Sequence, residues 1–169
     1  DNGKLTWYNL DLPETIEVRD SIYHEKGRIS TIACSVLDPK WTDQVKVRGK
    51  MIFIIEGLTM YMHEQEVKTM LEIIHDLFDN AYVCMETLCP FFVKKEGIEK
   101  SIKATGASFT WGANCFDDIK KIAVGYKKVK DDNIVRGMLT LNKMYALVAW
   151  MPIVKKFAQK ILVFEKVVD

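Results

Sequence analysis

The stretch Met51–Leu58, "MIFIIEGL", decides the fold. Its first five residues are apolar, and Glu56 and Gly57 follow them directly. A short and continuously apolar run is typical of a strand that is covered on both faces, as in a parallel sheet. A carboxylate at the end of such a strand costs free energy unless it is paired or meets a ligand. We therefore interpret Glu56 as a ligand-facing residue, with a structural salt bridge as the alternative.

Three other runs have the same apolar character, and helical patterns separate them. The further candidate strands are Leu5–Leu12, Arg28–Val36 and Ala81–Leu88. The clearest helix covers 63–80, where one face carries Val67, Met70, Leu71, Ile74 and Phe78. Another helix is expected to begin at Pro13, because proline suits the first helical position. This alternation predicts an α/β fold of three layers with a mostly parallel sheet.

The remainder of the chain continues the alternation. We expect a helix over 115–125 that ends near Gly125, a polar strand over 126–135, and a helix over 139–160 with a break at Pro152. A final strand, 161–168, closes the chain. We predict that this last strand is antiparallel and inserted beside its neighbours.

Composition excludes several classes of protein. The chain has 169 residues, of which 49% are hydrophobic, so we expect a single globular domain with its own core. A net charge of +1 argues against nucleic acid as a partner. The apolar run 144–154 is too short to span a bilayer, which argues against a membrane protein. The cysteines lack CxxC spacing, which favours free thiols in a reducing cytoplasm and gives no metal site. They are Cys34, Cys84, Cys89 and Cys115.

Polar residues follow four successive predicted strands. They are Asp11, Ser35, Glu56 and the pair Glu86-Thr87. Because parallel strands end at one edge of a sheet, and ligands of open α/β sheets bind beyond that edge, we expect a binding site there. Asp38, just past the second strand, is interpreted as a turn residue.

Two of these positions have competing interpretations. Asp11 can accept hydrogen bonds from ribose hydroxyls, or it can cap the helix that begins at Pro13. Ser35 and Val36 could flank a flat base, although the residues alone favour an ordinary strand end. The histidines His24, His63 and His75 are expected to be surface residues rather than a catalytic base.

Four segments, taken in order, resemble a known family. They are "WYNLDLPETIEVR", "SVLDPKW", "FIIEGLTMYM" and "FTWGANCFDDIKKIAVGYKKV". These segments are similar to motifs of the leucine carboxyl methyltransferase family, which includes polyketide-synthesis O-methyltransferases. The resemblance implies a Rossmann-like methyltransferase fold and S-adenosylmethionine as cofactor. It also implies an enzyme that methylates a carboxylate or hydroxyl of a small molecule.

The resemblance also assigns residues. Asp11 matches the acid that binds the cofactor's ribose, Ser35 and Val36 match the pair at the adenine, and Glu56 matches the acid beside the cofactor. The full set of implied cofactor-binding positions is Asp11, Leu12, Ser35, Val36, Glu56 and Gly57. Family members usually carry Asp where Ser35 stands, and a serine hydroxyl is a weaker acceptor than a carboxylate.

One part of the family pattern is missing from this chain. No first strand with its Gly-rich turn and no N-terminal lid precede Asp11, so we expect residues 1–169 to be an incomplete methyltransferase domain that starts at the second strand. The absent strand would lie beside the strand that ends at Glu56. Without it, strand edges are open, which favours association into homo-oligomers.

The chemistry leaves alternatives open. Methyl transfer from a sulfonium mainly requires alignment of donor and acceptor, and only a hydroxyl acceptor calls for a base, which the sequence does not identify. Tyr61, Phe109 and Trp111 are expected to line a substrate pocket, with ordinary packing as the alternative. An inactive methyltransferase-like scaffold is the rival function, and a dehydrogenase-like nucleotide-binding domain is a third.

Overall fold

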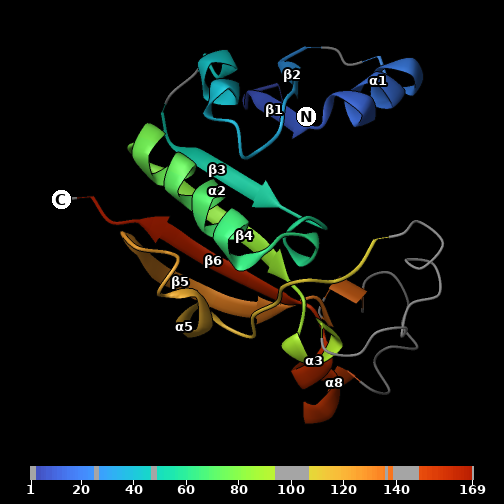
Figure 1. Cartoon of the computed structure of the whole chain (residues 1–169), viewed down its shortest axis with the longest axis vertical. Helices are drawn as coiled ribbons and strands as arrows, with labels where there is room; N and C mark the ends of the chain where they lie inside the picture. Colours follow the sequence, from blue (N-terminus) through green and yellow to red (C-terminus); the bar gives the residue numbers. More distant parts are fainter. Residues whose placement is uncertain are drawn as a thin grey trace. The chain divides into compact units, whose positions relative to one another are not determined.

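The computed structural model describes residues 3–24, 27–46, 49–93, 107–135, 137–138 and 149–168. The chain forms two compact units, Asp1–Gly49 and Lys50–Asp169, and each is described by itself below (Figure 1). Each unit contains its own sheet.

The first unit is built on a pair of parallel strands. β1 (Trp7–Asp11) and β2 (Ile29–Ala33) pair in register, with Asp11 opposite Ala33. The helix α1 (Pro13–Ile22) connects them and begins with proline at its first position, as predicted. The 3-10 helix η1 (Pro39–Gln44) follows β2. Four apolar side chains form the small core: Ile16, Ile32, Trp41 and Val45.

The second unit contains a four-stranded sheet in the order β3-β4-β6-β5. Its strands are β3 (Met51–Ile55), β4 (Ala81–Thr87), β5 (Tyr126–Asn133) and β6 (Lys160–Lys166). β3 and β4 are parallel, and β6 is antiparallel to both of its neighbours, β4 and β5. Three strands therefore run in one direction. The final strand is antiparallel and inserted between two others, which confirms the predicted topology.

One long helix covers a face of this sheet. α2 (Glu64–Leu77) follows the 3-10 helix η2 (Thr59–Tyr61), and its apolar stripe is the predicted one (Figure 1). The stripe residues Val67, Met70, Leu71 and Ile74 are all at most 2% exposed. The Tyr126 hydroxyl of β5 donates to the Leu71 carbonyl at 2.9 Å, and the rings of Phe53 and Phe78 contact each other. These contacts join the helix to the sheet.

β3 differs from the expectation of a strand covered on both faces. Ile52 and Ile54 are 66% and 59% exposed, whereas Ile55 is buried. The physical reason is position, because β3 is the edge of its sheet and pairs with β4 alone among the described strands. β4 is interior, and no residue of it is exposed. The expectation of a further strand beside β3 stays a prediction.

The remaining helices are short. They are α3 (Pro90–Val93), α5 (Phe116–Ile119) and α8 (Pro152–Phe157). The helix expected over 115–125 ends at Ile119, because turns carry the chain on to bury Ile122 and Ala123. Gly125 then takes φ +78°, and an added Cβ there would lie 2.2 Å from His75 Nε2. Residues 139–148 of the helix expected over 139–160 fall outside the described residues, but a helix does begin at Pro152.

A row of polar side chains crosses the sheet near the start of β4. Glu165 lies in register with Tyr82 on β4 and with Lys127 on β5. Lys127 Nζ lies 3.1 Å from the Glu165 carboxylate, and Lys50 Nζ lies over the Tyr82 ring. The hydrogen bond from Tyr82, and then Lys127, lower the pKa of Glu165. The same hydrogen bond raises the pKa of Tyr82.

This row of side chains predicts how the unfolding free energy depends on pH. The pKa of Glu165 is lower in the folded state than in the unfolded state, so its stabilising contribution is present above the unfolded value of 4.5 and is lost as pH falls through the folded value. Glu165→Gln should therefore flatten the acid limb of a plot of unfolding free energy against pH. Urea unfolding between about pH 3 and 6 measures this slope. Glu72→Gln, on the exposed face of α2, is the control, and equal slopes in both variants would refute the assignment.

Candidate functional site

In the first unit, Asp11 is the last residue of β1 and is exposed. Its carboxylate accepts the Leu12 N–H at 2.8 Å. Leu12 itself is the N-cap of α1, in an extended conformation and with no side-chain cap. Asp11 therefore does not cap this helix, which removes the structural alternative that the sequence left open. The Asp11 carboxylate forms no other hydrogen bond or ion pair in the described part of the chain.

The end of β2 lies beside Asp11. The Cys34 N–H donates to the Asp11 carbonyl at 2.9 Å, which continues the parallel pairing by one residue. Ser35 comes next, and its hydroxyl oxygen accepts the Leu37 N–H at 3.2 Å. This bond uses acceptor capacity of the hydroxyl and leaves its proton available to donate. The first unit thus brings the predicted positions of Asp11, Leu12 and Ser35 to one edge of its sheet.

The segment after Ser35 is fixed by its own contacts. The Val36 carbonyl accepts the indole N–H of Trp41 at 3.1 Å. The Asp38 carboxylate accepts the Lys40 N–H at 3.0 Å and caps η1, which confirms its interpretation as a turn residue. Val36 is half-buried and follows Ser35 directly in this fixed turn.

In the second unit, Glu56 and Gly57 follow β3 directly. Glu56 is exposed and has no hydrogen-bond or ion-pair partner among the residues that the structure describes. The predicted alternative of a structural salt bridge is therefore not realised within those residues. Gly57 takes φ +65°, which glycine adopts at little cost. The expected residue pair thus forms a turn with a free carboxylate at the carboxyl end of β3.

Glu86 is the residue that fixes this turn; the sequence placed it among the polar residues at strand ends but gave it no part in holding the cofactor. Its carboxylate accepts the Gly57 N–H at 2.8 Å, and its carbonyl accepts the Thr59 hydroxyl at 2.7 Å. Ile55 pairs with Met85, so Glu56 and Glu86 end neighbouring parallel strands. The signal that could have identified Glu86 was its place at a strand end.

The segment after residue 107 fastens to the same edge. Thr110 donates from its backbone N–H to the Met60 carbonyl at 2.9 Å and from its hydroxyl to the Met62 carbonyl at 2.7 Å. These bonds bring the ring of Phe109 to 5.6 Å from that of Tyr61, which is 42% exposed. The structure therefore brings together two of the three predicted substrate-pocket residues.

Trp111 behaves differently. It is 7% exposed and belongs to the core, which matches the alternative of ordinary packing. Gly112 follows it and lies so close to Leu88 that an added Cβ would be 2.3 Å from the Leu88 carbonyl oxygen. The Thr87 hydroxyl donates to the Ala113 carbonyl at 2.8 Å and closes this contact.

Metal ligation has no support within the described ranges. No group of three His, Cys, Asp or Glu side chains there could hold a metal ion. Among the described helices, none combines the length and apolar character needed to cross a membrane. The candidate residues are therefore carboxylates, a hydroxyl and tight turns, found in each unit at the carboxyl ends of its own parallel strands.

Comparison with known proteins identifies a relative in sequence. Tetracenomycin polyketide synthesis O-methyltransferase TcmP of Streptomyces glaucescens is 29% identical over 108 residues, which are 64% of this chain. The chain spans 40% of the length of that relative. No protein-family model matches the chain.

Several solved structures share the fold at low sequence identity. A DUF574 family protein from Streptomyces avermitilis matches 95% of this chain with a TM-score of 0.64 and 10% identity, and the match covers 64% of that protein. A methyltransferase structure from Thermobifida fusca matches 98% with a TM-score of 0.59 and 11% identity, again over 64% of that protein. LepI in complex with S-adenosylmethionine matches 98% with a TM-score of 0.59 and 11% identity, over 37% of its own length.

These likenesses agree with the motifs in the sequence. The second unit has an antiparallel last strand inserted between two others. The segments that resemble methyltransferase motifs lie before, on and after β3 in the sequence. The chain has the Rossmann-like fold that is also found in solved methyltransferase structures, and 108 of its residues are similar in sequence to a polyketide-synthesis O-methyltransferase.

Proposed function

We propose that the protein containing this chain is an S-adenosylmethionine-dependent O-methyltransferase that acts on a carboxylate or hydroxyl of a small molecule. The observation that carries the proposal is that each unit has free or locally fixed polar groups at the carboxyl ends of its own parallel strands, β1 and β2 in the first unit and β3 in the second. The likeness to TcmP, a polyketide-synthesis O-methyltransferase, supports the reaction type. We place this chain in the leucine carboxyl methyltransferase family on the basis of its sequence motifs alone.

The residues that would hold the cofactor have fitting chemistry. Asp11 is an exposed carboxylate with one local bond, so it has acceptor capacity for ribose hydroxyls. The Ser35 hydroxyl and the Val36 side chain would contact the adenine, with Leu12 as an exposed apolar neighbour of Asp11. Glu56 offers an unpaired carboxylate to a cationic molecule, and Gly57 lets backbone and ligand approach closely. When bound, S-adenosylmethionine would supply an electrophilic methyl group.

The protein's own contribution to the reaction is placement. A sulfonium methyl donor needs an acceptor oxygen in line, and a carboxylate acceptor is already nucleophilic. Tyr61 and Phe109 lie together and would contact the acceptor. His75 lies near the end of α2, and its Nδ1 is 2.9 Å from the Asp76 carboxylate. Because the end of α2 leads into the start of β4, His75 lies away from the carboxyl edge of the sheet. We therefore do not assign His75 as a catalytic base.

The setting of the protein follows from other observations. The four cysteines are free thiols, which fits a reducing cytoplasm. We propose that residues 1–169 belong to one methyltransferase domain. We also propose that copies of the protein associate through open strand edges, since β3 pairs with β4 alone among the described strands.

Asp11→Asn tests the cofactor assignment. Asparagine keeps an oxygen for the Leu12 N–H, so the unfolding free energy should change by less than about 0.5 kcal/mol. Loss of the charge removes charge-assisted hydrogen bonds to the ribose, so the affinity for S-adenosylhomocysteine should fall at least about tenfold. Calorimetric titration with S-adenosylhomocysteine measures the affinity of the intact wild type and of the intact Asp11→Asn variant.

Asp20→Asn is the matched control, because it removes the same charge from the exposed face of the adjoining helix. It should bind like the wild type. Wild-type affinity in the Asp11 variant would refute the ribose assignment. Absence of binding in a folded wild-type protein would favour an inactive methyltransferase-like scaffold.

Glu86 provides a second test, because it acts on the site through the turn after β3. Glu86→Ala frees the Gly57 N–H and should lower both the unfolding free energy, by about 0.5–1.5 kcal/mol, and the affinity for S-adenosylhomocysteine. Glu86→Gln keeps an acceptor oxygen and should restore most of both quantities. Urea unfolding and calorimetry measure them. If the alanine variant were destabilised but bound the cofactor product normally, the turn would have no part in the site.

A further inference from the structure

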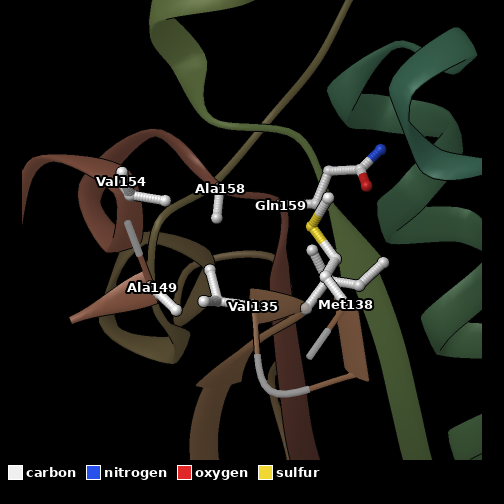
Figure 2. Close-up of a pocket in the computed structure, with 7 residues that line it drawn as sticks. Val135, Met138, Ala149, Val154, Ala158 and Gln159 are labelled. Atoms are coloured by element: carbon white, nitrogen blue, oxygen red, sulfur yellow. The ribbon is translucent and has the colours of Figure 1, made fainter. Parts of the chain in front are cut away.

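The second unit contains an apolar pocket that the preceding assignment does not use. We call it the β5–α8 pocket; Ile134, Val135, Met138, Ala149, Val154, Ala158 and Gln159 line it, and its volume is about 260 Å³. Figure 2 shows Val135, Ala149 and Ala158 around one space, with the Gln159 amide at one end and directed away from them. Its lining therefore offers one uncharged polar group and six apolar residues.

The pocket lies at the same edge of the sheet as Glu86. Ile134 follows β5 directly, and Gln159 precedes β6 directly. Because β6 is antiparallel, its first residue, Lys160, lies in register with Thr87 at the end of β4 and with Asn133 at the end of β5. β6 is two strands away from β3, which corresponds to about 10 Å at the usual strand spacing. The pocket is thus within reach of a molecule that also touches Glu56.

Hydrogen bonds between its walls hold the pocket in shape. The Ile134 N–H donates to the Gln159 carbonyl at 3.1 Å, which joins the wall after β5 to the wall before β6. The Met138 N–H donates to the Ile134 carbonyl at 3.1 Å, and the Ala158 N–H donates to the Val154 carbonyl at 2.9 Å. A pocket fixed by backbone bonds is largely formed before a ligand arrives, as is usual for small-molecule sites.

No charge is available to the occupant from the lining. Lys160 adjoins Gln159, but its amine donates to the carbonyls of Lys155 and Lys156 at the end of α8. An apolar cavity of about 150 Å³ holds one benzene molecule, so a volume of 260 Å³ fits a group of about two fused rings. The polarizable sulfur of Met138 makes favourable contacts with aromatic rings.

We propose that the β5–α8 pocket binds an uncharged, two-ring apolar portion of the methyl acceptor, while the accepting oxygen extends along the sheet edge toward β3. This inference rests on the proposed function, because it identifies the ligand as the methyl acceptor. Binding of an apolar two-ring group to the pocket requires neither cofactor nor turnover. It specifies an acceptor that is elongated, with its polar end about 10 Å from its apolar end.

The test uses 2-naphthol as the probe and the intact protein with isotope-labelled methionine and alanine methyl groups. Titration without cofactor should shift the methyl resonances of Met138, Ala149 and Ala158 and leave those of Met60 and Ala33 unchanged. Phenol, with one ring, should bind at least tenfold more weakly. Shifts confined to other methyl groups, or none at millimolar probe, would overturn the proposal.

A filled pocket gives an independent measurement. Ala158→Leu should reduce the affinity for 2-naphthol at least tenfold and leave the affinity for S-adenosylhomocysteine unchanged, whereas Ala33→Leu on β2 should leave the affinity for 2-naphthol unchanged. Equal 2-naphthol affinity in wild type and Ala158→Leu would refute the site. If Ala158→Leu does not fold, the wild-type methyl shifts decide. Naphthol binding without any cofactor binding would refute the proposed function and leave the pocket assignment standing.

Discussion

The hydrogen bond from the Gly57 N–H to the Glu86 carboxylate is the contact on which the candidate site depends. It joins the turn after β3 to the last residues of β4, and the Thr59 hydroxyl reinforces it through the Glu86 carbonyl. Parallel pairing alone brings two strand ends to one edge. This bond also fixes the path of the chain beyond the edge, and so it determines where Glu56 is presented. A carboxylate that is exposed and unpaired at such a place is available to a ligand.

The antiparallel last strand complements this arrangement. β6 starts at the carboxyl edge, where the Lys160 amine donates to the end of α8, and it finishes at the opposite edge, where the Lys166 amine donates to the His75 carbonyl at 2.7 Å. Each lysine thus satisfies carbonyls at the end of one helix. Burial lowers the pKa of Lys160, which is 8% exposed. One strand therefore ties α2 and α8 to the sheet, and the wall of the β5–α8 pocket depends on the second of these ties.

Much of the fold could be predicted from local pattern. The apolar runs located β1 to β4 to within a few residues, and the stripe from Val67 to Ile74 located α2, because both signals are local and periodic. The exposure of Ile52 could not be predicted, since it depends on the place of β3 in the strand order rather than on its composition. The helix at α5 was predicted, but its early end was not, because tertiary burial of Ile122 and the positive φ of Gly125 override helical periodicity.

The site was predictable to a similar extent. Strand ends indicated Asp11, Ser35 and Glu56, but only coordinates show that Leu12 rather than Asp11 begins α1 as its N-cap. Glu86 was noted only as a strand-end residue, because its role in fixing the turn depends on a backbone group 29 residues away in sequence. The β5–α8 pocket joins residues from three separate segments, which no single motif records.

A crystal structure of the intact protein with S-adenosylhomocysteine tests the central claim most directly. The account predicts the ribose hydroxyls within hydrogen-bond distance of the Asp11 carboxylate, the adenine beside Ser35 and Val36, and the amino-acid end near Glu56 and Gly57. A bound molecule whose ribose lies away from Asp11, or which occupies another edge of the sheet, would contradict it.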